Sequence, residues 1–247
     1  MKIIAAGVKR FKTAFTLVEL LTVIGIIGIL AALLLTVIPA VIRAAKIRKA
    51  TLQMADIASA IQSYESAYSH FPVSRAAQQV ANPDFTYGGT FRTPTGPVTI
   101  GTPVNGPVLQ NDQIIAVLMN FATYPGTAVS TINTNFQSNP QKTAFLNATM
   151  SGDTSSPGVG TDLVYRDPWG NPYVISLDLN DDGLCEDAFY KSNSISGGGI
   201  NGLILQPDGY YAFHGKIMVW SAGPDGKVNP NSAANQNENK DNVLSWH

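Results

Sequence analysis

From Phe15 to Ile42 the chain reads FTLVELLTVIGIIGILAALLLTVIPAVI, a run of 28 residues with one charged side chain, Glu19. A helix needs about 20 apolar residues to cross the hydrocarbon core of a bilayer, so this run is long enough to span one. In lipid the backbone has to satisfy its own hydrogen bonds, which predicts a helix in spite of the β-branched residues. Pro39 predicts a bend near the outer end. The segment 15–42 is therefore predicted to be a transmembrane helix.

A short basic leader precedes this span. Residues 1–14 carry Lys2, Lys9, Arg10 and Lys12 and no acidic residue. The whole chain has 16 Lys and Arg against 17 Asp and Glu, so without the four basic residues of the leader 12 remain against 17, a balance of −5. Four more basic residues follow the span closely, so the positive-inside count is a tie and charge alone does not set the orientation.

The composition argues against several classes of function. Charged residues make up 13% of the chain, about half the usual share of ~25%, so a basic face for nucleic acid is not expected. The single cysteine, Cys185, cannot form an internal disulfide and excludes a cysteine-based zinc site. No Walker loop, dinucleotide loop, nucleophile elbow or HExxH motif occurs. We therefore expect no enzymatic activity and no catalytic residues.

The apolar run has three competing interpretations. A secretory signal peptide has an apolar region of about 7–15 residues and no early acid. A plain signal anchor leaves Glu19 unexplained. A carboxylate inside a spanning helix costs roughly 2.5–3.5 kcal/mol, so this residue predicts a partner for its charge.

The stretch KTAFTLVELLTVIGIIGILAAL, residues 12–33, resembles the type IV prepilin signal shared by pilins and by the pseudopilins of type II secretion. In that family a basic leader is cut off before a Phe, and a Glu is the fifth residue of the mature chain. The resemblance implies that a prepilin peptidase cleaves between Ala14 and Phe15 and methylates the new amine, although the family usually has Gly where this chain has Ala14. It also implies that Glu19 pairs with the N-terminal amine of a neighbouring subunit during filament assembly. Such pairing would remove the cost of an isolated charge in lipid.

After the span, apolar residues recur at steps of three and four. The members of this stripe are Ile47, Ala50, Met54, Ile57, Ile61, Tyr64, Tyr68 and Phe71. The spacing predicts an amphipathic helix over 43–71 that docks on a sheet, with a two-helix coiled coil as the alternative. The helix should stop by His70, because Pro72 disfavours helical backbone in the residue before it.

Residues 72–160 predict a loop-rich insertion with short helices. The stretch 72–110 is rich in Pro, Gly and Thr and indicates loops with short strands. Residues 112–122 (DQIIAVLMNFA) follow the capping-type Asn111 with a helical apolar pattern, and residues 140–148 (PQKTAFLNA) predict a second short helix. The sequence is compatible with a role in fibre contacts and with a purely structural role.

Residues 161–247 predict an antiparallel sheet and a long C-terminal loop. The turn DPWGNPY at 167–173 precedes strand-like alternation, and 210–220 (YYAFHGKIMVW) predicts further strand. This part resembles the major pseudopilin of type II secretion systems, in which a DPWGNPY turn is followed by an SxGxDG loop and by an Asp before an apolar residue and a Trp. The counterparts here are SAGPDG at 221–226 and DNVLSW at 241–246. The resemblance implies an α+β, pilin-like fold, with a long N-terminal helix packed on a small antiparallel sheet.

The same resemblance implies calcium in the C-terminal loop. Carried over by position, Asp225 and Asp241 are the side-chain ligands. Backbone carbonyls near Ser221, Lys227 and Val228 help to complete the six to eight oxygens that calcium takes. The loop between the two aspartates is longer than in the family, and Asn242 stands where the family favours an apolar residue. A solvated, Asn-rich loop without metal is the alternative.

A second candidate metal loop is DLNDDGLCED, residues 178–187. Asp178, Asn180 and Asp182, with Gly183, match the first half of an EF-hand-type loop, D-x-N-x-D-G. An acidic hairpin turn that uses Asp and Gly for ordinary turn chemistry is the alternative.

The second half of this loop departs from the EF-hand pattern. Phe189 occupies the twelfth position, where that motif has a bidentate Glu, and Asp187 is a substitute only in a different geometry. Cys185 is expected to be a spectator.

These features together predict a structural subunit of a type II secretion pseudopilus, processed by prepilin peptidase and polymerised into a helical periplasmic filament that supports protein secretion. The expected partners are further copies of the chain, other pseudopilins and an inner-membrane assembly platform, with calcium as the cofactor and no nucleic acid. The expected location is the inner membrane, with a single pass, a cytoplasmic leader and a periplasmic C-terminal head.

Two alternatives remain open. One is a type IV pilin of a surface fibre. The other is a membrane-anchored, calcium-dependent adhesin or binding head, for which Trp169 and Trp220 would supply a ligand platform.

Overall fold

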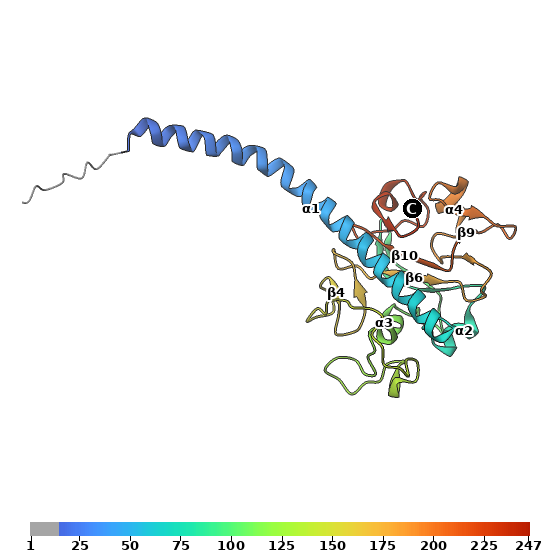
Figure 1. The fold of residues 1–247 in the computed structure, drawn as a ribbon. Coiled ribbons are helices and arrows are strands. Elements are labelled where there is room, and N and C mark those ends of the chain that lie inside the picture. The colour runs from blue at the N-terminus through green and yellow to red at the C-terminus, as the bar shows by residue number, and fades with distance from the viewer. Residues whose placement is uncertain (1–14) are drawn as a thin grey trace, which may run out of the picture. The chain divides into compact units, whose positions relative to one another are not determined.

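The protein is described by a computed structural model that covers residues 15–247. The basic leader, including Ala14, lies outside the described residues. The chain divides into two compact units, Met1–Ala44 and Ala45–His247. A long helix, α1 (Leu17–Tyr68), is followed by small antiparallel sheets (Figure 1), which confirms the predicted α+β, pilin-like fold class.

In the first unit, α1 exposes its side chains on all sides. Every described side chain from Phe15 to Ala44 is exposed, and Pro39 lies within the helix. Within the described part of the chain, α1 is the one helix that is long and apolar enough to cross a membrane. A continuous apolar surface of this extent requires lipid or an apolar partner.

In the second unit, the same helix buries one stripe. Met54, Ile57, Ile61 and Tyr64 are fully buried, whereas Leu52 on another face is 66% exposed. The helix ends at Tyr68, two residues before the predicted limit. Full burial of a large apolar side chain stabilises the fold by about 1.5–3 kcal/mol, so the stripe ties this half of α1 to the head. The predicted docking face is confirmed.

The stripe packs on a four-stranded antiparallel sheet of order β1-β6-β10-β11. Its strands are β1 (Phe85–Tyr87), β6 (Val174–Leu177), β10 (Ile217–Ser221) and β11 (Val243–Leu244). Ile175 pairs with Tyr87 on one side and with Val219 on the other, and all three side chains belong to the same core cluster as α1. Figure 1 shows the second half of α1 lying across β6 and β10.

The opposite face of this sheet supports a second core. Val174, Met218 and Trp220 alternate with the residues that face α1 and pack with Phe189 and Tyr190 in a separate cluster. Both faces of β6 and β10 are therefore covered, which explains why every residue of these two strands is buried.

Shorter elements complete the head. Residues 72–166 contribute α2 (Arg75–Val80), the hairpin β2 (Gly89–Thr93) and β3 (Gly96–Ile100), α3 (Asp112–Leu118), a 3₁₀ turn at Thr134–Phe136, and the pair β4 (Gly158–Val159) and β5 (Tyr165–Arg166). Residues 184–241 contribute β7 (Leu184–Cys185), α4 (Asn193–Ser196), a 3₁₀ turn at Gly197–Gly199, β8 (Ile204–Leu205), β9 (Tyr211–His214) and a 3₁₀ turn at Asn237–Asp241. A three-stranded sheet has the order β7-β9-β8.

The segment 72–160 takes part in the main sheet. Its strand β1 pairs along its whole length with β6, so the sheet is not confined to residues 161–247. Helix α3 begins directly after Asn111 as predicted, but the Asn111 side chain makes no capping hydrogen bond. Its buried amide instead joins two distant segments: Nδ2 donates to the carbonyls of Tyr165 (3.0 Å) and Tyr173 (2.7 Å), and Oδ1 accepts the Tyr165 N–H (2.8 Å).

The helix predicted at 140–148 is wrong, because this stretch has irregular backbone. The N–H groups of Phe145 and Leu146 both donate to the carbonyl of Leu118 at the end of α3. The Asn139 side chain donates to the carbonyl of Thr143 (2.7 Å). Backbone groups that a helix would use internally are thus bound by tertiary partners.

Candidate functional site

The start of α1 is a capping box formed by Thr16 and Glu19. The Thr16 N–H and Oγ1 both donate to Glu19 Oε2 at 2.8 Å, and the Glu19 N–H donates to Thr16 Oγ1 at 3.2 Å. These bonds satisfy N–H groups that have no partner within the helix. The T-x-x-E spacing is a known signature of such a box, so this role of Thr16 was readable from the sequence and was missed.

The predicted processing site lies just before this box. Ala14 is outside the described residues, and Phe15 has a side chain that is 71% exposed. Glu19 is the one charged residue of the exposed apolar stretch 15–42. The box leaves Oε1 of this carboxylate outside its hydrogen bonds.

The DPWGNPY turn and the SAGPDG loop bind each other. Asp167 is buried and accepts the Ser221 hydroxyl at 2.5 Å, while Asn171 Nδ2 donates to the Gly223 carbonyl at 3.0 Å. A Cβ on Gly226 would lie 2.5 Å from Asn171 Oδ1, so the absence of a side chain allows this approach. The two motifs that carry the pseudopilin resemblance thus form one connected structure.

The SAGPDG loop also contacts the segment of Asp241. Gly223 has φ +68°, and a Cβ there would lie 2.1 Å from the Asp241 carbonyl oxygen. The two segments expected to share calcium are therefore adjacent. Asp225 is exposed, and its Oδ1 accepts the Lys227 N–H at 2.8 Å. The donors present, two carboxylates among loop carbonyls, suit calcium chemically.

The loop 178–183 joins β6 to β7. Asp178 is fully buried, and its Oδ2 accepts the Gly183 N–H at 2.8 Å. Asn180 and Asp182 are exposed, and Asn180 Nδ2 donates to Asp182 Oδ2 at 2.8 Å. Burial raises the pKa of Asp178, although backbone N–H groups of the loop oppose that effect. The three predicted ligands lie in one short loop.

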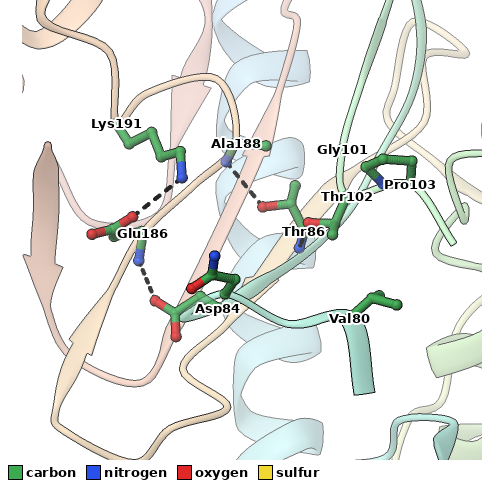
Figure 2. Close-up of a pocket in the computed structure, with 10 residues that line it drawn as sticks. Val80, Asp84, Thr86, Gly101, Thr102, Pro103, Glu186, Ala188 and Lys191 are labelled. Carbon is green, nitrogen blue, oxygen red and sulfur yellow. Dashed lines mark hydrogen bonds and ion pairs between the residues drawn. The ribbon is translucent and has the colours of Figure 1, made fainter. Parts of the chain in front are cut away.

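Asp84 lies beside this loop and was not identified from the sequence. Its Oδ1 accepts the Leu179 N–H (3.2 Å) and its Oδ2 accepts the Glu186 N–H (2.6 Å), so the carboxylate binds backbone on both sides of the loop. Figure 2 shows Asp84 close to Glu186, whose own carboxylate binds Lys191 at 3.3 Å. Burial raises the pKa of Asp84 to about 7. These partners are about one hundred residues away from Asp84, which explains why no local pattern indicated them.

A pocket of about 250 Å³ opens next to Asp84. Thr86, Thr102 and Ala188 are among the residues that line it (Figure 2), and the Thr86 hydroxyl accepts the Ala188 N–H at 3.0 Å. Its polar groups hold the backbone of neighbouring segments together.

Asp187 does not take the place of the missing twelfth-position ligand. Its Oδ1 accepts the N–H groups of Phe189 and Tyr190, and its Oδ2 accepts the Ser176 hydroxyl (2.7 Å) and the Trp220 indole N–H (3.0 Å). Trp220 is fully buried and stacks on Phe189, so it offers no surface for a ligand. Trp220 belongs to the second core, and Asp187 is bound to it there through the indole N–H.

Other candidate chemistry is sparse in the described residues. Cys185 is a free, buried thiol, and His214 is exposed on β9. In residues 15–247 no group of three or more His, Cys, Asp and Glu side chains is placed to hold a metal ion.

Comparison with known proteins identifies the N-terminal segment. Residues 9–35 match the family model described as the prokaryotic N-terminal methylation motif. No curated protein and no solved structure matches the chain. The matched segment contains Ala14, Phe15, Thr16 and Glu19 and extends well into the apolar part of α1. The protein therefore carries a type IV pilin-like signal for prepilin-peptidase processing on a chain with a pilin-like fold.

Proposed function

We propose that this protein is a structural subunit of a type II secretion pseudopilus. The observation that carries the proposal is the methylation motif, which continues directly into an exposed apolar helix whose one acid, Glu19, lies near its start. Processing and filament assembly in general follow from the motif. The assignment to a secretion filament rests on the resemblance of the C-terminal third.

Cleavage between Ala14 and Phe15 creates a new amine four residues before Glu19. The cation and the carboxylate then lie near the same end of the helix. In a single subunit, Glu19 is held by Thr16 of its own capping box. In an assembled filament, the amine of a neighbouring subunit supplies a full opposite charge, which is worth far more in lipid than in water. This pairing favours one axial stagger between subunits.

The exposed stretch of α1 provides the filament core in this proposal. Its described side chains from Phe15 to Ile42 are exposed and, apart from Glu19 and threonines, apolar, so lipid can be exchanged for the same stretch of neighbouring subunits without exposing apolar surface to water. The head then remains on the periplasmic side, and an inner-membrane platform with other pseudopilins drives growth.

Calcium at the C-terminal loop belongs to this proposal as an implied cofactor. Asp225 and Asp241, with loop carbonyls, would hold the ion, which would neutralise the two carboxylates and order the loop. The close approach of Gly223 to the Asp241 carbonyl supports the pairing of these segments.

A pseudopilus is favoured over a surface pilus because the DPWGNPY and SAGPDG motifs are both present and bind each other through Asp167 and Ser221. Electron microscopy of cells at native expression distinguishes a pseudopilus from a surface pilus by the length and location of the filaments. We expect filaments confined to the periplasm, and long surface fibres would remove the secretion assignment.

The assembly step is tested with Glu19→Ala and Glu19→Gln in the full chain. Both remove the charge, so both should be cleaved normally yet fail to enter filaments, as measured by mass spectrometry and by sedimentation of sheared filaments. Thr22→Val is the matched control, since Thr22 lies about one turn further along and its hydroxyl donates only to the Val18 carbonyl (2.8 Å). This control should assemble. Normal filaments from both Glu19 variants would contradict the proposed charge pairing.

A further inference from the structure

The loop 178–183 connects the two cores of the head. It follows Leu177, the last residue of β6, which packs in the cluster under α1. It leads into β7, whose Cys185 packs in the second cluster. An interaction that holds this loop in place would therefore also stabilise the connection between the sheet of β6 and the sheet of β7.

Asp178 has a buried oxygen that needs a partner. The residue is fully buried, its Oδ2 takes the Gly183 N–H across the loop, and its Oδ1 is buried with no hydrogen-bond partner. A buried polar atom without a partner is destabilising, and more so when it is charged. The second oxygen of this carboxylate therefore lacks the partner that a bound cation would supply.

Asn180 and Asp182 place further oxygens in the same loop. Asn180 Nδ2 donates to Asp182 Oδ2, so the two side chains already converge. Turning the Asn180 amide about its last side-chain bond would present its oxygen in place of the nitrogen. Asp182 Oδ1 accepts the Leu184 N–H at 2.8 Å, which holds this carboxylate against the loop.

Side-chain cations do not neutralise these carboxylates. Lys216 Nζ binds Asp181 (2.6 Å) and Glu65 (2.8 Å). Throughout residues 15–247, no Lys, Arg or His forms an ion pair with Asp178 or Asp182. The carboxylates of Asp178 and Asp182 thus lie in one loop, and neither is paired with a basic side chain in the described residues.

A cleft of about 290 Å³ opens beside the loop. It is lined by Asn180 and Asp182 together with two more acidic residues, Glu186 and Asp208. Solvent can therefore reach the side of the loop that carries Asn180 and Asp182, and the acidic lining favours the approach of a cation.

We infer that this loop binds a calcium ion through side-chain oxygens of Asp178, Asn180 and Asp182 and the backbone carbonyl of Leu184, at the first, third, fifth and seventh positions of an EF-hand-type half-loop. Gly183 has φ +81° at the sixth position, where that motif requires glycine for its sharp turn. Water completes the coordination, because Phe189 replaces the bidentate ligand. Fewer protein oxygens place the affinity near the 10⁻⁴–10⁻³ M range of extracellular modules.

This inference is independent of filament assembly and of the C-terminal loop. It involves two carboxylates plus amide and carbonyl oxygens, and it does not require a group of three acidic or imidazole side chains, which is not found in residues 15–247.

Calcium binding to the full chain in detergent micelles tests the inference. Isothermal titration with calcium chloride, repeated with magnesium chloride, is performed on the wild type, Asp178→Asn, Asp182→Asn, Asp181→Asn and Asp225→Asn. Asp181→Asn is the matched control, because Asp181 lies in the same loop but pairs with Lys216. Asp182 is exposed, so its variant keeps the test decisive if Asp178→Asn does not fold.

We expect Asp178→Asn and Asp182→Asn to weaken calcium binding at least about tenfold, since ligand charge sets affinity in such loops. Asp181→Asn and Asp225→Asn should stay within about twofold of the wild type at this site. Three results would overturn the inference: no calcium binding at millimolar concentration, equal binding by Asp182→Asn and wild type, or magnesium binding as tight as calcium. Loss of all binding in Asp225→Asn alone would assign the ion to the C-terminal loop instead.

Discussion

At the scale of single residues, buried polar side chains join segments that are far apart in the chain. Asn111 bridges to residues 54 and 62 positions away, and Asp84 binds the N–H groups of residues 95 and 102 positions away. Each bond replaces one that the backbone group would otherwise make to water, so losing the side chain leaves a buried group unpaired.

Asn111→Ala tests this role. The substitution leaves the Tyr165 N–H and the Tyr173 carbonyl without the Asn111 amide, while the Tyr165 carbonyl keeps the Tyr173 N–H, so the free energy of unfolding should fall by roughly 3 kcal/mol. Urea denaturation of the fragment Ala45–His247, which contains all of the buried apolar residues of the described chain, measures the effect. Gln62→Ala on the exposed face of α1 is the control and should change stability by less than about 0.5 kcal/mol. If Asn111→Ala lowered the free energy of unfolding as little as Gln62→Ala does, water would be replacing the Asn111 amide, and the proposed bridging role would be wrong.

Residue roles were predictable from the sequence where the partners are local. The T-x-x-E box and the D-x-N-x-D-G loop use partners within five positions, so spacing alone indicates them. The contacts of Asn111, Asp84 and Asp167 depend on tertiary structure, and each of these residues has an ordinary local context. Asn111 was accordingly interpreted as a helix cap, because Asn before an apolar helical run usually serves as one.

At the scale of elements, α1 has two surfaces of different character. Up to Ala44 its described side chains are exposed, whereas from Ala50 onward one stripe is buried against the main sheet. The steps of three and four predicted this stripe correctly, since about seven turns of regular spacing leave little ambiguity. Pro72 predicted that the helix stops by His70, and it ends at Tyr68, before Phe71, the last residue of the predicted stripe. The strands have only two to five residues, too few for alternation to give their bounds, and the helix expected at 140–148 was overridden by contacts with α3.

Ile57→Ala and Leu52→Ala compare the two faces of this helix. Ile57 is fully buried, so its truncation should lower the free energy of unfolding of Ala45–His247 by about 2–5 kcal/mol. Leu52 is 66% exposed, and its truncation should cost less than about 0.5 kcal/mol. Chemical denaturation measures both. Equal effects would mean that the stripe does not dock on the sheet as described.

At the scale of the whole molecule, the chain combines a processing signal, a helix able to cross a membrane and a head with two cores. The signal match over residues 9–35 and the fold class were both readable from the sequence, because they rest on a contiguous motif and on long-range periodicity. The contact between the DPWGNPY and SAGPDG motifs through Asp167 was not predictable from the sequence, because it joins segments more than fifty residues apart. In the proposed function, filament assembly uses all three parts, and its first step is removal of the leader.

Intact-mass spectrometry of the protein purified from its native membrane tests this first step most directly. We expect a mature chain that begins at Phe15, lacks residues 1–14 and carries a methyl group on its new amine, with Glu19 as its fifth residue. A chain that still begins at Met1 would contradict processing, and with it the pairing of Glu19 with a neighbouring amine.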